Sequence, residues 1–282
     1  MNVSKKYFIF FLFFLYTIFN AQTEKKEQLI GDFTYLLKGK IYKSTPNYTY
    51  EELFSLQVLN DRALFISEQA IKYDSIFESE FKKSFRSGGN IDLRGKSFPK
   101  TKFPYTIVQT NSDIRYFEKV GMALLSYKEP TINNWRLIDE SKIINSFKCK
   151  KAEVTYKGRN WVAWYSVDIP LPYGPYKFTG LPGLIIKITD QNGDYDFELV
   201  KSLSSDNLKD AILTIKEKRY SNAKETTAIG LQEAKNNFIN NMIGSLGSTE
   251  TTIAPNSMET VRNIQKQKQQ NMMDENSIEQ IK

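Results

Sequence analysis

Carboxylates are the acid–base groups that this sequence brings together most densely. The chain has no histidine and one cysteine. This composition removes Ser-His-Asp and Cys-His nucleophilic systems, HExxH zinc sites and Cys-ligated iron–sulfur clusters, and it leaves no disulfide within the chain. The acidic residues close to one another in the richest segment are Asp168, Asp190, Asp194, Asp196 and Glu198. Two of them at a suitable distance could serve as the acid and the base of a hydrolase.

The same carboxylates have a simpler interpretation. Asp190 and Asp194 flank Gln-Asn-Gly, which is what a tight hairpin turn requires. The spacing superficially resembles a calcium loop, but the ordered D-x-D-x-D-G pattern with its later glutamate is missing. Gly180–Gly183 is followed by no Gly-Lys-Ser/Thr, so it is not a phosphate-binding loop. We therefore predict no catalytic residue, no metal site and no cofactor, and we expect Cys149 to be a part-buried structural residue.

A stiff loop is the other feature that could carry function. Pro170, Pro172 and Pro175 fix φ over 169–179 and remove backbone donors, so this segment should cross an edge or mouth of the sheet without joining it. It is either an aromatic-rimmed recognition loop or a proline-braced plug that closes the β core. The following hexapeptide has no polar side chain that could do chemistry, which favours the plug. In the recognition alternative, the candidate binding residues are Trp164, Tyr165, Pro170, Tyr173, Gly174, Pro175, Tyr176, Leu181, Pro182 and Gly183.

Short strands must position these groups. Apolar and polar residues alternate along most of the chain, with Asn-Asp and Asn-Gly turn pairs between the runs. The expected strands are 33–37, 53–58, 63–67, 103–109, 114–120, 123–128, 149–156, 161–169, 184–189, 195–200 and 212–217. Large apolar residues on both faces of 161–169 predict a central strand covered on two sides. Because helical crossovers are nearly absent, the fold class is mainly β, an antiparallel meander that forms a curved sheet or half-barrel.

One or two helices should pack on this sheet. An aromatic side chain recurs at every fourth position of the first: Tyr73, Phe77, Phe81 and Phe85. This stripe predicts an amphipathic helix that faces the core, in preference to a ligand platform. A second helix is expected near 227–243, before Gly244. From Ser245 the chain turns polar, so 245–282 is predicted to be a flexible or weakly helical tail.

The first residues have the pattern of an export signal. Lys5 and Lys6 precede the apolar run Tyr7–Phe19, and Ala21 offers a small residue at a cleavage point. We expect a signal peptide over 1–21 and a single β-rich domain over 22–244. No later apolar run is long enough to predict a membrane span after cleavage. The net charge of +7 is small for this length and predicts no nucleic-acid partner.

The segment from Cys149 to Asp190 resembles a known family. It contains a Trp-Tyr strand, Gly174-Pro175 and the hexapeptide Gly-Leu-Pro-Gly-Leu-Ile at 180–185. The chain is thereby similar to the GLPGLI family, exported proteins of Gram-negative bacteria named for that hexapeptide. Trp135-Arg136-Leu137 also fits, and Asn276-Ser277-Ile278-Glu279 resembles the family's Asn-Pro-Ile-Glu with serine in place of proline. The resemblance implies export, to the periplasm or the cell surface, and provides no catalytic residues.

These patterns favour a non-enzymatic envelope protein. Its partner would be a hydrophobic small ligand or an envelope protein, because the expected architecture resembles the half-barrels of bacterial lipoprotein carriers, which hold apolar ligands on a concave face. Two alternatives remain. One is a carboxylate-dependent hydrolase that uses Asp168 and Asp190, and the other is a passive envelope assembly component that makes contact through its polar tail. The oligomeric state stays open.

Overall fold

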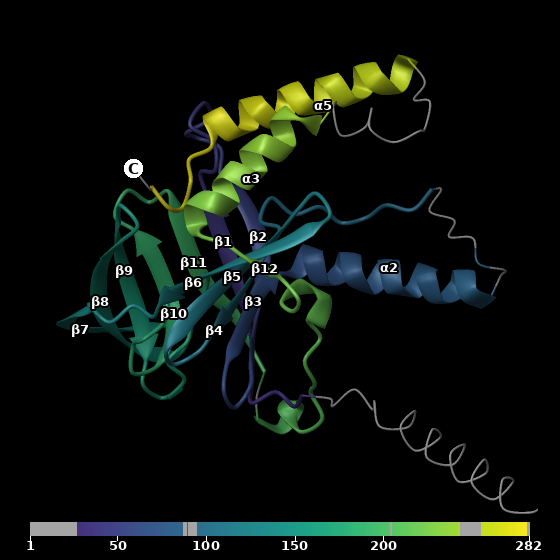
Figure 1. Cartoon of the computed structure of the whole chain (residues 1–282). Coiled ribbons are helices and arrows are strands. Elements are labelled where there is room, and N and C mark those ends of the chain that lie inside the picture. The colour runs from purple at the N-terminus through teal and green to yellow at the C-terminus, as the bar shows by residue number, and fades with distance from the viewer. Residues whose placement is uncertain (1–26, 87–88, 90–94, 204, 243–254, 281–282) are drawn as a thin grey trace, which may run out of the picture.

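A single curved sheet organises the chain. The computed structural model describes residues 27–86, 89, 95–203, 205–242 and 255–280. Its 12 strands form one sheet in the order β12-β6-β5-β4-β3-β2-β1-β11-β10-β9-β8-β7 (Figure 1). The prediction of a mainly β fold is confirmed, and the sheet is open. The strand bounds are β1 Gly31–Gly39, β2 Tyr50–Val58, β3 Ala63–Ser67, β4 Tyr105–Gln109, β5 Asp113–Val120, β6 Ala123–Pro130, β7 Arg136–Ile144, β8 Phe147–Tyr156, β9 Arg159–Ser166, β10 Leu184–Asp190, β11 Tyr195–Ser202 and β12 Lys224–Glu225.

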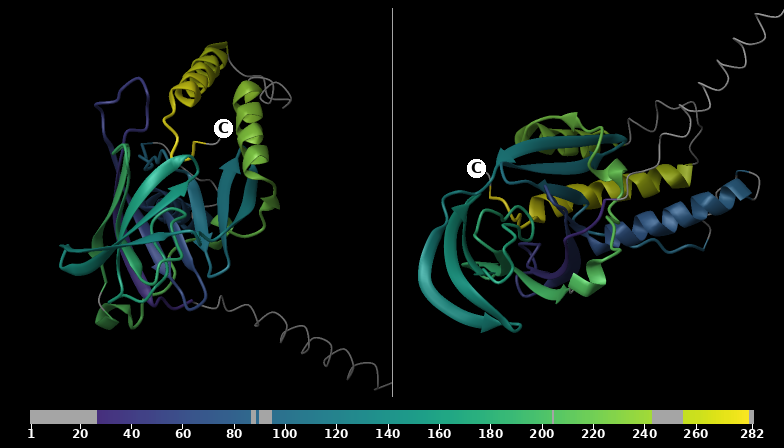
Figure 2. Two further views of the ribbon diagram at one scale, coloured as in Figure 1. Left: turned by 90° about the vertical axis from the view of Figure 1, so that its left-hand side faces the viewer. Right: turned by 90° about the horizontal axis from the view of Figure 1, so that it is seen from below.

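Two antiparallel meanders meet at β1. Strands β2 to β6 follow β1 on one side, and β11 back to β7 follow it on the other, with Leu37 paired with both Glu52 and Phe197. Among the described strands, only the short β12 lies parallel to its neighbour. Register shifts at Thr34/Tyr35, Ile138/Ser141 and Ile185/Lys187 bend the strands that carry them. Figure 2 shows the resulting strong curvature of the sheet.

Some sequence-based strand assignments differ from the structure. The prediction of a strand at 212–217 is wrong. The Thr214 amide donates to a side chain, Gln57 Oε1, at 2.9 Å, and Ile212 forms only an isolated bridge, so the segment does not pair as a strand of the sheet. Two 3-10 turns flank this stretch, at Ser205–Leu208 and Glu217–Arg219. Strand β7 was missed because it is an edge strand with a mostly exposed, polar surface, so it carries no buried alternation.

The core packs on both faces of the sheet, with a large cluster that includes Phe65 and a small one that includes Leu64 and Ile66. The large cluster surrounds the proline-rich loop. It includes the stacked rings of Phe54 and Phe65, 4.9 Å apart, and Trp161, whose ring lies 4.6 Å from that of Phe178. Phe178 belongs to the proline-rich loop, and residues 173–179 of this loop are all buried. Strand β9 is central, as expected, between β10 and β8. The loop therefore packs into the core in the way that the plug interpretation requires.

Helix α2, Glu68–Arg86, occupies the predicted position but does not face the core. Tyr73 is 39% exposed, Phe81 42% and Phe85 72%, so the expectation of a core-facing stripe is wrong. The helix follows β3 directly, buries Ala70 and Asp74 near its start, and then projects away from the sheet (Figure 1). The aromatic rings contact one another instead, with 5.0 Å between the centroids of Phe81 and Phe85.

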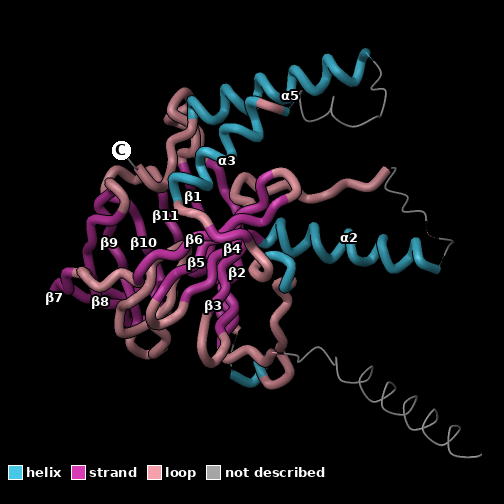
Figure 3. Tube along the Cα trace, in the orientation of Figure 1, coloured by secondary structure: helices cyan, strands magenta, loops and turns pink. Residues whose placement is uncertain are grey.

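Helices α3 and α5 lie together over one side of the sheet. Helix α3, Ala228–Asn240, is capped by the Thr227 hydroxyl, which accepts the Gly230 amide, and it contacts β5, β6 and α5. Helix α5, Pro255–Asp274, runs alongside it (Figure 3). The predicted polar tail 245–282 thus includes a helix, and residues 275–280 lie against the sheet. The predicted signal peptide 1–21 lies outside the described residues, and no described helix is long and apolar enough to span a membrane.

Candidate binding site beneath the C-terminal segment

Residues 275–280, here called the C-terminal segment, dock between the end of β1 and the β8–β9 turn. The Asn276 amide donates to the Ile41 carbonyl at 3.0 Å, and the Gln280 amide donates to the Lys157 carbonyl at 2.8 Å. Gly158 has a φ of +80°, and a Cβ placed there would lie 2.7 Å from the Gln280 carbonyl oxygen. The β8–β9 turn can therefore reach the segment only because glycine occupies this position.

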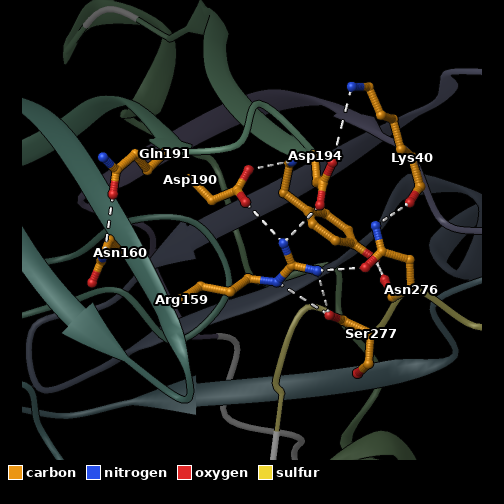
Figure 4. A network of polar contacts seen from close by, with 9 residues as sticks. Lys40, Arg159, Asn160, Asp190, Gln191, Asp194, Asn276 and Ser277 are labelled. Carbon is orange, nitrogen blue, oxygen red and sulfur yellow. Dashed lines mark hydrogen bonds and ion pairs between the residues drawn. The ribbon is translucent and has the colours of Figure 1, made fainter. Parts of the chain in front are cut away.

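Arg159 fixes the start of the segment. Its guanidinium is buried and donates through Nη1 to Asp190 Oδ2 at 2.8 Å and to Asp194 Oδ2 at 3.0 Å. Nη2 donates to Asn276 Oδ1 at 2.7 Å and to the Ser277 carbonyl at 2.9 Å (Figure 4). Burial alone would raise the pKa of Asp194, but its hydrogen bonds with Arg159 and Asn276 hold this pKa below the ordinary value. One buried cation thus joins two strands of the sheet to the segment.

Two further hydrogen bonds complete this end of the segment. The Tyr195 hydroxyl donates to the Asn276 carbonyl, and Asn276 Nδ2 donates to the Lys40 carbonyl at 2.8 Å. Together with the bonds from Arg159, they engage the main chain and the side chain of Asn276. The segment is thus recognised by its polar groups, in addition to any apolar packing of Ile278.

Lys177 fixes the other end of the segment. Its side chain is fully buried, and Nζ donates to Glu279 Oε1 at 2.5 Å, Glu129 Oε2 at 3.2 Å and the Tyr127 hydroxyl at 2.8 Å. Glu129 also accepts hydrogen bonds from Tyr156 and Lys157. Although burial would raise the pKa of Glu129, the charge of Lys177 and these donors hold it below the ordinary 4.5. Lys177 and Lys157 thus face Glu129 and Glu279, so each buried charge in this cluster has a partner of opposite sign.

Tyrosine rings surround this ammonium group. The centroids of Tyr116, Tyr127 and Tyr176 lie 5.1, 4.8 and 5.5 Å from Lys177 Nζ, within the range of cation–π attraction. Tyr105 packs on two of them, 5.2 Å from Tyr116 and 5.6 Å from Tyr176. Its hydroxyl is buried without a hydrogen-bond partner, and burial raises its pKa well above the ordinary value. A buried donor without a partner is costly and calls for an explanation.

A cleft of about 440 Å³ opens beside these rings, between α3, the C-terminal segment and strands β4 to β6. Five tyrosines line it: Tyr105, Tyr116, Tyr127, Tyr176 and Tyr195. Glu118 and Glu279 also line it, and both are paired, Glu118 with Lys235 at 3.0 Å and Glu279 with Lys177. The cleft offers aromatic surface with hydroxyl groups, and its buried carboxylates are neutralised by neighbouring cations.

Comparison with known proteins finds limited similarities and no activity. A family model described as "Protein of unknown function (Porph_ging)" matches residues 153–187, which run from β8 through β9 and the proline-rich loop into β10. The hexapeptide at 180–185 lies within this stretch, while the resemblance to GLPGLI proteins stays a prediction. No curated protein shows a significant match to the sequence.

Solved structures share limited similarity with the fold. Two crystal forms of PNGF-II match with TM-scores of 0.48 and 0.47, at 15% and 12% identity over 75% and 74% of this chain. They are covered to only 34% and 33%, so the chain spans about a third of PNGF-II. An uncharacterized conserved protein from Thermus thermophilus matches with a TM-score of 0.30 and 12% identity, over 70% of this chain and 90% of that protein.

Of the binding residues suggested by the sequence, the structure places Tyr176 in the cleft wall. Tyr165, Tyr173, Pro175 and Leu181 are buried in the core. The Gly174 carbonyl accepts Gln109 Nε2 at 2.7 Å, and a Cβ at Gly183 would lie 2.1 Å from the Ser166 carbonyl oxygen. The four buried residues and the two glycines therefore contribute to the packing of the core. Pro170 and Pro182 are exposed, and Trp164 packs under Lys142, whose Nζ lies 3.8 Å from the ring centroid.

Of the carboxylates that the sequence singled out, Asp190 and Asp194 meet at the Arg159 guanidinium, but the five do not all converge on one site. Asp168 is exposed beyond the end of β9 that pairs with Leu184, whereas Asp190 lies at the opposite end of the β9–β10 pair. Asp196 and Glu198 both pair with Lys187. Among the described residues, no group of three potential His, Cys, Asp or Glu ligands could hold a metal ion. Cys149 is buried, and burial raises the pKa of its thiol.

Sequence reasoning missed Arg159, Lys177 and the tyrosines of β4 to β6. Lys177 had a recognisable signal, because a lysine between Tyr176 and Phe178 in a proline-rich, aromatic stretch must bury its charge if the stretch is buried. The motif from Asn276 to Glu279 is recognisable in the sequence only as a resemblance to the family's C-terminal motif. Nothing local indicated that it contacts residues about 100 positions earlier, such as Lys177.

Proposed function

We propose that this protein is a non-enzymatic binding protein whose tyrosine-lined cleft holds a small, largely apolar ligand. The observation that carries the proposal is the cleft of about 440 Å³ with five tyrosines, together with the unpartnered, buried hydroxyl of Tyr105. Tyrosine rings supply apolar contact area, and a hydroxyl group orients a ligand that carries a hydrogen-bond acceptor. A ligand that accepts this bond satisfies a donor that the protein leaves unpaired.

The proposal also places the protein in the cell envelope. The basic, apolar and small residues of 1–21 have the order of an export signal, which supports function in the periplasm or at the cell surface. Glu118 and Glu279 are each engaged in an ion pair with a lysine, so their carboxylate oxygens already have partners, which favours binding over acid–base chemistry. The exposed Asp168 and the distant Asp190 offer no support for the hydrolase alternative.

Native mass spectrometry of residues 22–282, purified from an exported preparation, tests this function. We expect additional mass that is lost on denaturation and that identifies the ligand class. Tyr105→Phe should lower ligand occupancy several-fold, because it removes the free hydroxyl and keeps the ring. Tyr48→Phe, at an exposed position away from the cleft, is the matched control. The proposal would be rejected if the native protein had only the mass of its polypeptide chain and bound no apolar probe.

A second candidate, binding of an envelope protein, is favoured by α2. Phe77 and the exposed Phe81 border a groove of about 580 Å³ whose other side includes Ile215 and Lys218. Crosslinking in the cell envelope should trap a partner with the native chain and lose it with Phe81→Ser. Lys82→Ser, one position along the same helix, is the control. Identical crosslinks for native protein and Phe81→Ser would remove this candidate.

A further inference from the structure

Glu279 occupies a position that a ligand could take. Its Oε1 accepts hydrogen bonds from Lys177 Nζ at 2.5 Å and from the Tyr176 hydroxyl at 2.6 Å. Both Glu279 and Tyr176 line the tyrosine cleft, so this carboxylate lies where the cleft meets the buried ammonium group. The geometry is that of a carboxylate held by one charged and one neutral donor.

Lys177 requires a carboxylate at this position. Glu129, its other anionic partner, is shared with Lys157 and also accepts a hydrogen bond from Tyr156. If Glu279 were removed without replacement, the fully buried Lys177 and its neighbour Lys157 would face one carboxylate. An uncompensated buried charge is strongly unfavourable, so an incoming anion would bind there favourably.

We infer that Lys177 and Tyr176 form a carboxylate receptor, that Glu279 fills it as an internal ligand, and that the cleft binds apolar carboxylic acids that displace Glu279. The inference rests on the proposed function and adds the ligand class. The tyrosine rings receive the apolar body of the acid, and its carboxylate takes over the bonds from Lys177 and Tyr176. The exchange replaces one carboxylate by another, so the net charge of the buried cluster does not change.

The remaining acidic residues of the cleft do not oppose this exchange. Glu118 is paired with Lys235, and Glu233 and Glu275 are exposed at the rim, where water and salt screen their charges. The release of Glu279 is also local, since Asn276 at the other end of the segment has its own bonds to Arg159 and Lys40. The segment can therefore stay attached while Glu279 leaves.

Calorimetric titration of the mature chain with cinnamate and with cinnamamide tests the inference, because the two probes share one apolar body. The acid should bind at least about tenfold more tightly than the amide. Glu279→Gln removes the competing internal carboxylate, so it should raise the affinity for cinnamate by about tenfold or more and leave the affinity for cinnamamide unchanged. Cinnamate should also accelerate hydrogen exchange of the Gln280 amide, which is bonded to Lys157, and cinnamamide should not.

Two further variants localise the receptor. Tyr176→Phe keeps the buried ring and removes one donor, so it should weaken cinnamate binding several-fold without an effect on the amide. Lys102→Met removes an exposed lysine that lines the cleft and has no carboxylate partner among the described residues, so it should preserve the preference for the acid. Equal affinities for acid and amide, or an unaltered preference in Glu279→Gln, would overturn the carboxylate receptor and leave the cleft as a binding site. The proposed function would also be overturned if neither cinnamate nor cinnamamide bound and native mass spectrometry found no bound ligand.

Discussion

Arg159 at the start of β9 and Asn276 beyond α5 are 117 positions apart in the sequence and joined by a 2.7 Å hydrogen bond. The same guanidinium binds Asp190 and Asp194, so the C-terminal segment is attached to the sheet through a buried ion pair. At the opposite end, Lys177 binds Glu279 in the same way. The cleft therefore depends on two buried cations that hold one short segment.

Arg159→Met should be among the most destabilising substitutions at this site. It leaves Asp190, whose side chain is 1% exposed, as a buried carboxylate without its cation. Loss of one member of such a pair costs about 3–5 kcal/mol. Urea unfolding followed by circular dichroism measures this free energy. Arg136→Met is the control, because Arg136 is 70% exposed beside Glu153 and its loss should cost about 1 kcal/mol or less. Equal costs for the two variants would show that the buried pair is not formed.

Asn276→Ala should loosen the C-terminal segment while the sheet stays folded. The alanine loses the hydrogen bonds to Arg159 Nη2 and to the Lys40 carbonyl, at a cost of about 1–3 kcal/mol. Hydrogen exchange should become faster at the amides of residues 276 and 280 and stay slow in β1 and β9. Asn192→Ala, in the exposed β10–β11 turn, should leave the exchange of the segment unchanged. Unaltered protection in Asn276→Ala would mean that other contacts hold the segment.

The sequence predicts local structure much better than it predicts this site. The alternation in β1 and β8 and the Asn-Gly pair between β10 and β11 act within a few residues, so strands and turns can be read from them. The contact of Lys177 with Glu279 depends on the return of the chain after 102 positions, and no local pattern encodes it. The proline-rich loop pointed to Tyr176, but most of the other residues named with it are buried and serve packing, and Pro170 and Pro182 are exposed outside the cleft lining.

The helix α2 shows another limit of sequence reasoning. A four-residue aromatic period predicts which residues share a face, and Tyr73, Phe77 and Phe81 do lie beside one another. Whether that face is covered depends on how far the sheet extends beneath the helix. The sheet ends near the first turns, so Phe85 is 72% exposed. Periodicity alone cannot report the extent of a neighbouring element.

Acid should destabilise the Lys177 cluster in a defined pH range. The pKa of Glu129 lies below its ordinary 4.5 in the folded protein, because Lys177 and its other partners favour the charged form against the effect of burial. A lowered folded pKa contributes stability that is complete above the unfolded pKa and is lost as pH falls through the folded pKa. Glu129→Gln should therefore reduce stability near neutral pH and flatten its decline below about pH 4.5. Urea unfolding of both proteins between neutral pH and about pH 3 measures the difference, and parallel curves would contradict it.

Gly158→Ala and Gly193→Ala form a matched pair that isolates the docking of the C-terminal segment. Both glycines have positive φ, +80° and +67°, so alanine is strained by about 1–2 kcal/mol at either position. At Gly193 a Cβ meets nothing within 4 Å, whereas at Gly158 it would lie 2.7 Å from the Gln280 carbonyl oxygen. Gly158→Ala should therefore lose more stability and also expose the Gln280 amide to hydrogen exchange, which Gly193→Ala should leave protected. Equal losses, with the segment still protected in both variants, would show that the β8–β9 turn does not hold it in place.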